Sequence, residues 1–200
     1  MNGRYAHVEP LRQDHEGALW AEVSSGGDPA LWDYLPYGPF GDRAEFAAWQ
    51  AGCRESEAPR FFAVSGESGA AAGMLALARD KPQHRVIELA HVWFGPSLQH
   101  TRAATEAVFL AARHAFDDLG YRRLEWKCNA DNDRSRRAGE RFGFTYEGTF
   151  RQHMIVKGRN RDTAWFSMLD SEWPARRDLF ERWLAPENFD AAGRQLTSLR

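Results

Sequence analysis

A strand that breaks at a Gly-Pro turn and runs directly into a helix is the feature of this sequence that most constrains its fold. Residues 86–94 read VIELAHVWF, a run rich in β-branched and aromatic residues, and Gly95-Pro96 ends it. A polar turn then opens into a helical pattern near Arg102. The first turn of such a helix has unpaired backbone N–H groups and a partial positive charge. The junction therefore predicts an anion site, with a phosphate-bearing cofactor as its first candidate ligand.

Composition limits the classes of protein to which the chain can belong. Its 200 residues, 43% of them apolar, are enough for one domain with a substantial core. The formal net charge of -2 gives no basic footprint, so we expect no nucleic-acid partner. No apolar run approaches the roughly 20 residues that cross a bilayer, and we expect no signal peptide, no membrane partner and a cytoplasmic location. Two cysteines, Cys53 and Cys128, and seven scattered histidines predict reduced thiols and no metal.

The order of expected elements mixes hairpins with one or two crossover helices. Strands are expected over residues 5–9, 61–65, 71–78, 86–94, 123–128, 145–156 and 163–169, and helices over 14–23, 42–56, 104–119, 131–142 and 173–183. Asp42 is expected to cap one helix at its start, and Gly120 to follow another at its end. This order predicts an α/β or α+β fold with a mixed sheet.

The turn after the Gly-Pro break has the residue types that a phosphate site needs. It reads Gln99-His100-Thr101-Arg102-Ala103-Ala104, in which small residues allow the backbone to approach a ligand closely. Thr101 or Thr105 can donate a hydroxyl hydrogen to a phosphate, and Arg102 adds positive charge. The alternative is a solvated helix start that binds nothing.

Two further positions each leave two interpretations open. Asn132 and Ser135 lie one helical turn apart, so they either contact a ligand together or simply cap the helix. Glu88 lies inside an apolar strand, where a carboxylate is unfavourable unless it is paired or borders a cleft. Alternation puts Glu88 on one face with Ala90, Val92 and Phe94. Glu88 is then either a base with a raised pKa or one partner of a structural ion pair.

An aromatic loop supplies candidates for the acceptor side of a site. We expect the acceptor side to be flanked by Trp32, Tyr34, Tyr37 and Phe40 together with His153 and the KGRNR hairpin of residues 157–161, and core packing is the alternative for the aromatic side chains. Such a wall favours an amine with apolar parts over a large anionic polymer.

Three segments resemble the GNAT superfamily of acetyl-CoA-dependent N-acetyltransferases, and more narrowly its RimJ/RimL-type branch. They are IELAHVWFGPSLQHTRAATEA, DDLGYRRLEWKCNADNDRSRRAGERFGFTYEGTFR and GRNRDTAWFSMLDSEW. The resemblance implies a central, mostly antiparallel twisted sheet with a splayed parallel strand pair, flanked by helices. It also implies one acetyltransferase domain over residues 1–173. We expect residues 174–200 to form a helical extension that packs on this domain or meets a second subunit, which leaves a homodimer open.

The resemblance also implies roles for individual residues. The splayed strands would admit the pantetheine arm of acetyl-CoA, and the following loop would hold the pyrophosphate. The implied cofactor contacts are Val92, Trp93, Phe94, Gln99, His100, Thr101, Arg102, Ala103, Ala104, Thr105, Asn132 and Ser135. Glu88 would be the general base and Ser135 the proton donor to the departing thiolate. Arg102 departs from the family pattern, because it stands where the first loop glycine belongs and would be strained at a positive φ.

The expected function is acetyl transfer from acetyl-CoA to a primary amine, either a protein N-terminus or a small amine such as an amino acid. The amine would attack the thioester directly in a ternary complex, with strand amides near Val92 polarising the carbonyl. A ping-pong scheme through Cys128 is less favoured, because that thiol lies within a strand. The alternatives are a non-catalytic acyl-CoA-binding module and, more weakly, a nucleic-acid module using the arginines of residues 122–141, which alternate with acids.

Overall fold

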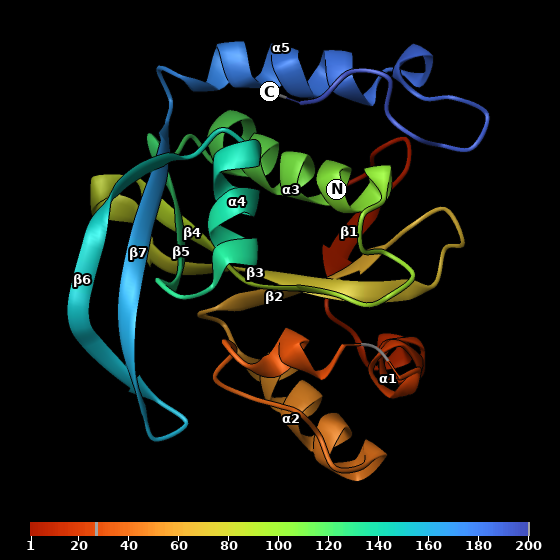
Figure 1. The fold of residues 1–200 in the computed structure, drawn as a ribbon, viewed down its shortest axis with the longest axis vertical. Helices are drawn as coiled ribbons and strands as arrows, with labels where there is room; N and C mark the ends of the chain where they lie inside the picture. The colour runs from red at the N-terminus through yellow and green to blue at the C-terminus, as the bar shows by residue number, and fades with distance from the viewer. Residues whose placement is uncertain (27, 200) are drawn as a thin grey trace.

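The computed structural model describes residues 1–26 and 28–199, and within them the chain forms one twisted sheet with helices on both faces (Figure 1). The strand order is β1-β2-β3-β4-β5-β7-β6, and β4 and β5 form the parallel pair. The strands are β1 (His7–Pro10), β2 (Arg60–Ser65), β3 (Ala71–Lys81), β4 (Val86–Phe94), β5 (Arg123–Asn129), β6 (Thr145–Val156) and β7 (Arg159–Leu169). The α-helices are α1 (Glu16–Ser24), α2 (Arg43–Glu55), α3 (Arg102–Arg113), α4 (Asp133–Arg141) and α5 (Trp173–Leu184). The predicted fold class is confirmed.

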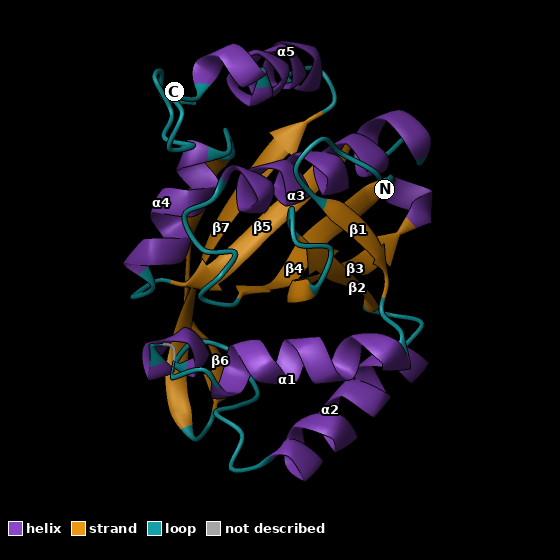
Figure 2. Cartoon of the chain, turned by 90° about the vertical axis from the view of Figure 1, so that its right-hand side faces the viewer, coloured by secondary structure: helices purple, strands orange, loops and turns teal. Residues whose placement is uncertain are grey.

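Two cores lie on opposite faces of the sheet. Helices α3, α4 and α5 cover one face and α1 and α2 the other, as Figures 1 and 2 both show. Strand β3 serves both, since Leu75 and Leu77 join the core beneath α3 while Met74 and Ala76 join the core against α1 and α2. A strand buried on both faces reads as a continuous apolar run, as β3 does. We call these the α3-side core and the α2-side core.

Strands β4 and β5 separate after only three residues of pairing. The register joins Val86–Glu88 to Arg123–Glu125 and ends there. Beyond that point β4 stays paired with β3 as far as Phe94, and β5 stays paired with β7 as far as Asn129. The carboxyl halves of two central strands therefore diverge, and their facing edges are not bonded to each other.

A buried carboxylate holds the N-terminal segment against α3. Glu106 is 4% exposed and accepts hydrogen bonds from the backbone N–H groups of Arg4, Tyr5 and Ala6 at 2.9, 2.5 and 2.7 Å. A Cβ at Gly3 would lie 2.4 Å from the same carboxylate, so the close approach needs a glycine there. This anchor lies in the same helix whose first turn borders the loop after β4.

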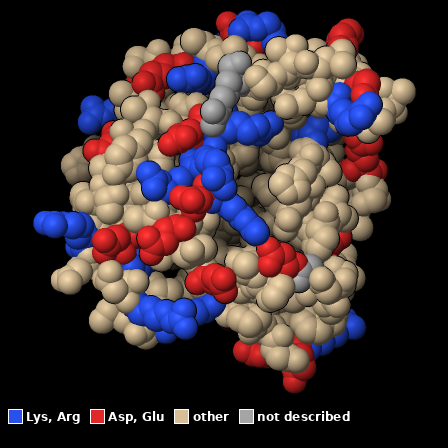
Figure 3. All heavy atoms as spheres, in the orientation of Figure 1, with Lys and Arg blue, Asp and Glu red and all other residues tan. Residues whose placement is uncertain are grey.

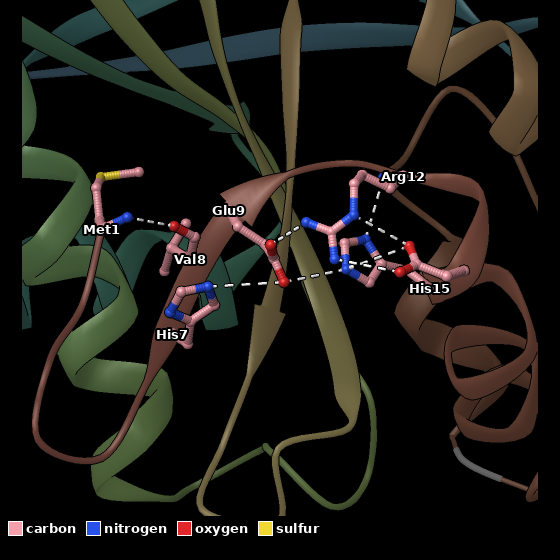
Figure 4. A network of polar contacts seen from close by, with 7 residues as sticks. Met1, His7, Val8, Glu9, Arg12 and His15 are labelled. Atoms are coloured by element: carbon pink, nitrogen blue, oxygen red, sulfur yellow. Dashed lines mark hydrogen bonds and ion pairs between the residues drawn. The ribbon is translucent and has the colours of Figure 1, made fainter.

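Polar contacts at the end of β1 set the direction of the chain into α1 (Figure 4). The Met1 ammonium donates to the Val8 carbonyl at 2.7 Å, and Glu9 contacts both Arg12 and His15. Burial raises the pKa of Glu9, but its bonds with Arg12 and His15 outweigh that effect and lower the pKa below its usual value. The residues before α1 form a short 3₁₀ turn, Gln13–His15, where the sequence predicted the first turn of a helix.

Helix α5 belongs to the α3-side core. Phe180 stacks on Phe109 of α3 with ring centroids 5.3 Å apart, and the indole N–H of Trp173 donates to Asp117 at 2.6 Å. The chain then folds back so that Leu199 is buried. Residue 200 of the expected extension lies outside the described residues. No helix in the described part of the chain is long and apolar enough to cross a membrane.

Replacing the Glu106 carboxylate should destabilise the fold strongly. Glu106→Ala leaves three backbone donors without an acceptor, and we expect a loss of roughly 2–5 kcal/mol in the free energy of unfolding. Urea denaturation measures it. Glu140→Ala, an exposed glutamate on α4, is the control and should change stability by less than about 0.5 kcal/mol. An equal effect of both substitutions would contradict this account.

The β6 carboxylate Glu147 should make stability depend on pH. Two hydrogen bonds from Arg123, at 2.8 and 2.6 Å, lower the pKa of Glu147 to about 2, against a smaller opposing effect of burial and with help from Ser167. This contribution is therefore present above the ordinary glutamate pKa of about 4.3 and is lost as pH falls toward about 2. The urea midpoints of wild type and Glu147→Gln should differ at pH 6 and converge in strong acid. A difference between the two urea midpoints that does not change with pH would contradict this role of Glu147.

Candidate functional site

Glu88 lies where β4 and β5 separate, and it is part of an ion pair. The residue is 7% exposed, and its Oε2 lies 2.5 Å from Lys127 Nζ and 3.5 Å from Arg79 Nε. The Lys127 side chain is 5% exposed, and its ammonium lies 4.5 Å from the ring centre of Trp165. Burial raises the pKa of Glu88 and lowers that of Lys127, while the charge of each opposes the shift of the other. The ion-pair alternative weighed for Glu88 is present, and the carboxyl also borders a cleft.

A β-bulge at His91 reverses the alternation expected along β4. Ala90 pairs with Ala76 and Trp93 with Met74, so two residues of β4 face one residue of β3. His91 has a φ of +51°. Trp93 consequently shares the face of Glu88 and lies in the α2-side core, whereas Val92 and Phe94 pack against the α3-side core. The expectation that Val92 and Phe94 share the face of Glu88 was wrong, because strict alternation fails at a bulge.

His91 itself is a cleft residue that sequence reasoning missed. Its ring stacks on Tyr37 with centroids 5.7 Å apart, and its Nδ1 lies 3.3 Å from the Tyr37 hydroxyl. Burial, helped by the charges of Arg161 and Lys127, lowers the pKa of His91, so the imidazole is neutral at pH 7. A histidine inside an apolar strand was the available signal, but only the bulge turns it into the cleft.

The loop after β4 is closed by its own side chains and leaves donors at the start of α3. The Gln99 amide donates to the Phe94 carbonyl at 2.7 Å, and the Thr101 hydroxyl accepts from the Ala104 N–H at 3.2 Å. Within the described residues, the backbone N–H groups of Arg102 and Ala103 donate to no protein acceptor. These are the free donors expected of a helix start that can receive an anion.

Arg102 is not strained, contrary to the expectation that followed from its place in the loop pattern. The positive φ of the loop, +61°, belongs to His100, and Arg102 is the first residue of α3. The Arg102 guanidinium bonds to Glu67 at 2.7 Å and lies 4.0 Å from the Tyr5 ring centre. Its side chain thus fastens the helix start to neighbouring segments.

Asn132, which precedes α4, and Ser135, in the first turn of α4, are placed by capping contacts. The Asn132 side chain accepts from the Ser135 N–H at 3.0 Å, which is the capping alternative. The Ser135 hydroxyl accepts from the Trp126 indole at 3.1 Å and borders Cys128, whose pKa burial raises. Asn132 and Ser135 also line the cleft, so capping does not remove them from the site.

The aromatic loop divides between core and cleft. Trp32 is 4% exposed and packs with Trp93, Tyr37 and Phe40 in the α2-side core. The loop residues Trp32, Tyr37 and Phe40 do not line the cleft. Core packing therefore replaces the expected wall at Trp32, Tyr37 and Phe40. Tyr34 does line the cleft, and its hydroxyl donates to the Asp131 carbonyl at 3.1 Å.

A single cleft of about 2350 Å³ brings the remaining predicted residues together. It runs from Glu88 and His153, through the gap between β4 and β5, to the start of α3. Every cofactor contact implied by the resemblance lines it. Cationic side chains that were not named as site residues line it too: Arg79, Lys127, Arg134, Arg137, Arg141 and Arg194, together with Arg161 of the hairpin expected on the acceptor side. Lys and Arg side chains gather beside a hollow on the face drawn in Figure 3.

No other centre competes with this cleft in the part of the chain that is described. No group of three or more His, Cys, Asp or Glu side chains there could hold a metal ion. Cys53 and Cys128 are buried free thiols. The cleft, with an open strand edge at one end and free helix donors at the other, is the candidate site.

Comparisons with known proteins agree with this geometry. The solved structure of a GCN5-related N-acetyltransferase from Brucella melitensis is 51% identical and superposes with a TM-score of 0.97, covering 99% of this chain and 90% of that one. A probable GNAT acetyltransferase from Chromobacterium violaceum is 44% identical with a TM-score of 0.80, covering 86% of this chain and 87% of that one.

A curated relative is more distant. YdaF of Bacillus subtilis, which is named for ribosomal N-acetyltransferase activity, is 28% identical over 109 residues, or 54% of this chain. The match spans 59% of YdaF, less than two thirds of its length. The model of the acetyltransferase (GNAT) domain matches residues 7–145. The chain therefore belongs to the GNAT family of acetyltransferases.

Proposed function

We propose that this acetyltransferase moves the acetyl group of acetyl-CoA to a primary amine, as a member of the RimJ/RimL-type branch. The observation that carries the proposal is the unpaired edge of β4, which leads to the free N–H groups of Arg102 and Ala103. The similarity to YdaF supports the narrower branch, whose members act on a protein N-terminus. A small amine is the other acceptor that we retain.

The cofactor would lie along the open strand edge. Backbone groups of residues 92–94 would pair with the pantetheine arm, and the N–H groups at the start of α3 would bind the pyrophosphate. The remaining loop contacts proposed are Gln99, His100, Thr101, Ala104 and Thr105, with Asn132 on the opposite side. Arg137, an exposed cation of the cleft, would add charge near the phosphates.

The chain's own residues would then move two protons. Acetyl-CoA supplies a thioester that a neutral amine can attack. Glu88 lies four residues from Val92, about 13 Å along an extended strand, so it would receive the amine proton through water in the cleft. Ser135 accepts from Trp126 and hydrogen-bonds the Cys128 thiol, so its hydroxyl hydrogen would turn from Cys128 to the leaving thiolate.

A non-catalytic acyl-CoA-binding module remains a second candidate, because Lys127 engages the carboxylate that the chemistry would need. In that case Glu88 would act only through its ion pair. The two candidates predict different effects of the same substitution.

Glu88→Gln separates them. If Glu88 is the base, thiol release from acetyl-CoA with an amine panel should fall roughly 10²–10⁴-fold, with coenzyme A affinity unchanged. The acid limb of the kcat/KM profile should disappear as well, because that limb reports the protonation of Glu88. In the wild type the limb should lie above the ordinary glutamate range, because burial raises the pKa of Glu88. Glu125→Gln, on the neighbouring strand, is the control for altered charge. Full turnover by Glu88→Gln would exclude Glu88 as the base, and silence of the wild type toward every amine and peptide would favour the binding module.

Replacing Arg102 with the glycine of the family pattern should lower the stability of the protein and change its affinity for coenzyme A little. Arg102→Gly removes the Glu67 ion pair and the stacking on Tyr5, so we expect about 1–2 kcal/mol lower stability in thermal or urea unfolding. Coenzyme A affinity should rise little, because Arg102 already has helical backbone angles. Arg102→Lys keeps the charge and should lose less. A more stable glycine variant with much tighter binding would show that Arg102 is strained.

A further inference from the structure

The acceptor side of the cleft carries an excess of positive charge. Glu88, Lys127, Arg79 and Arg161 all line it, and we call these four residues the acceptor-side cluster. One carboxylate, Glu88, contacts two of the cations, Lys127 at 2.5 Å and Arg79 at 3.5 Å. Three cations and one anion leave an excess of two positive charges.

Two nearby acids, Asp80 and Glu125, make their direct contacts with groups outside the acceptor-side cluster. Asp80 also borders the cleft, but its carboxylate accepts from the Tyr121 hydroxyl. Glu125 pairs with Arg123 at 3.0 Å. The charge of Glu125 still acts on Lys127 from a distance, but neither carboxylate forms an ion pair with a cation of the cluster.

Arg161 is the cation of the cluster that lacks a partner. It follows the tip of the β6–β7 hairpin and precedes Thr163, which pairs with Asn129 at the end of β5. Its Nε is buried without a hydrogen bond, and no carboxylate of the described residues lies within ion-pair distance of its guanidinium. Burial lowers the pKa of Arg161, and the charge of Glu88 opposes this shift without reversing it.

An unpaired, partly buried guanidinium is unfavourable unless a ligand accepts its hydrogen bonds and balances its charge. Its planar fork of donors matches a carboxylate, which can accept two parallel hydrogen bonds. The free energy lost by burying Arg161 alone would be regained when an anionic ligand enters. A polycation entering the same space would instead meet three positive charges.

We propose that the acceptor amine carries a carboxylate close to its amino group and that Arg161 binds this carboxylate. The proposal rests on the proposed function, because it names the acceptor class of that same site. Either the α-carboxylate of a free amino acid or the acidic side chain of a peptide's first residue supplies this chemistry. Polyamines should be poor acceptors.

An acceptor panel tests the proposal on the unmodified protein. The arms are free amino acids, the matching amino-acid amides, dipeptide amides that begin with Asp or Glu, and spermidine. Rates of thiol release are compared at equal concentrations of deprotonated amine. We expect kcat/KM for one or both carboxylate arms to exceed that for the uncharged amides by about tenfold or more. The preferred carboxylate arm identifies the source of the anion.

Two variants assign the preference to a residue. Arg161→Gln should lower kcat/KM for the preferred carboxylate arm far more than for the amides, and so abolish the carboxylate preference. Arg159→Gln, an exposed arginine on the same strand and outside the cleft, should keep the preference. Equal loss in all arms for Arg161→Gln would overturn the proposal, as would better turnover of amides or spermidine by the wild type.

A binding measurement distinguishes a failure of the acceptor assignment from a failure of the proposed function. Calorimetry of N-acetyl amino acids and their amides is carried out on protein saturated with coenzyme A, and it needs no turnover. Tighter binding of the acids by wild type, but not by Arg161→Gln, supports the proposal. Protein that binds coenzyme A but favours the amides refutes only the acceptor assignment. Protein that binds no coenzyme A refutes the proposed function itself.

Discussion

The early end of the hydrogen-bonded register between β4 and β5 is the constraint on which the site depends. Each strand keeps its outer neighbour, so the sheet stays whole while its centre opens. The buried pair of Glu88 and Lys127 lies where the strands part. Removing either partner of such a pair leaves a buried charge uncompensated, and this costs more free energy than the intact pair contributes. Neither side chain can therefore be replaced independently of the other. The open edge, the loop and the start of α3 then follow as one continuous surface.

Much of this architecture could be predicted from local patterns. The bounds of β4 and β6 and the Asp42 cap of α2 were predicted, because each depends on periodicity or on a residue's own backbone preference. The mixed α/β class followed from the order of the elements, and the splayed parallel pair followed from the resemblance to the GNAT superfamily. The His91 bulge could not be predicted, since it depends on how β4 registers with β3. The loop at Arg102 was misjudged for a related reason. A pattern aligned to glycine does not say which neighbour takes the positive φ.

The candidate site was predicted as a set of positions rather than as an electrostatic environment. Glu88 was singled out, but its partner Lys127 is 39 residues away and no local signal links them. The aromatic loop was singled out for its composition, which cannot distinguish a buried Trp32 from a cleft-lining Tyr34. The hairpin that contains Arg161 was expected on the acceptor side, but no local signal showed that this arginine would be partly buried without an ion-pair partner among the described residues. Long-range packing therefore decides which charges meet the cleft.

A crystal structure of the protein with coenzyme A would test the central claim most directly. The account predicts the pantetheine arm beside the backbone of residues 92–94 and the pyrophosphate within hydrogen-bond distance of the Arg102 and Ala103 N–H groups. Coenzyme A bound elsewhere would contradict it. So would crystals soaked at millimolar concentration that hold no ligand between β4 and β5.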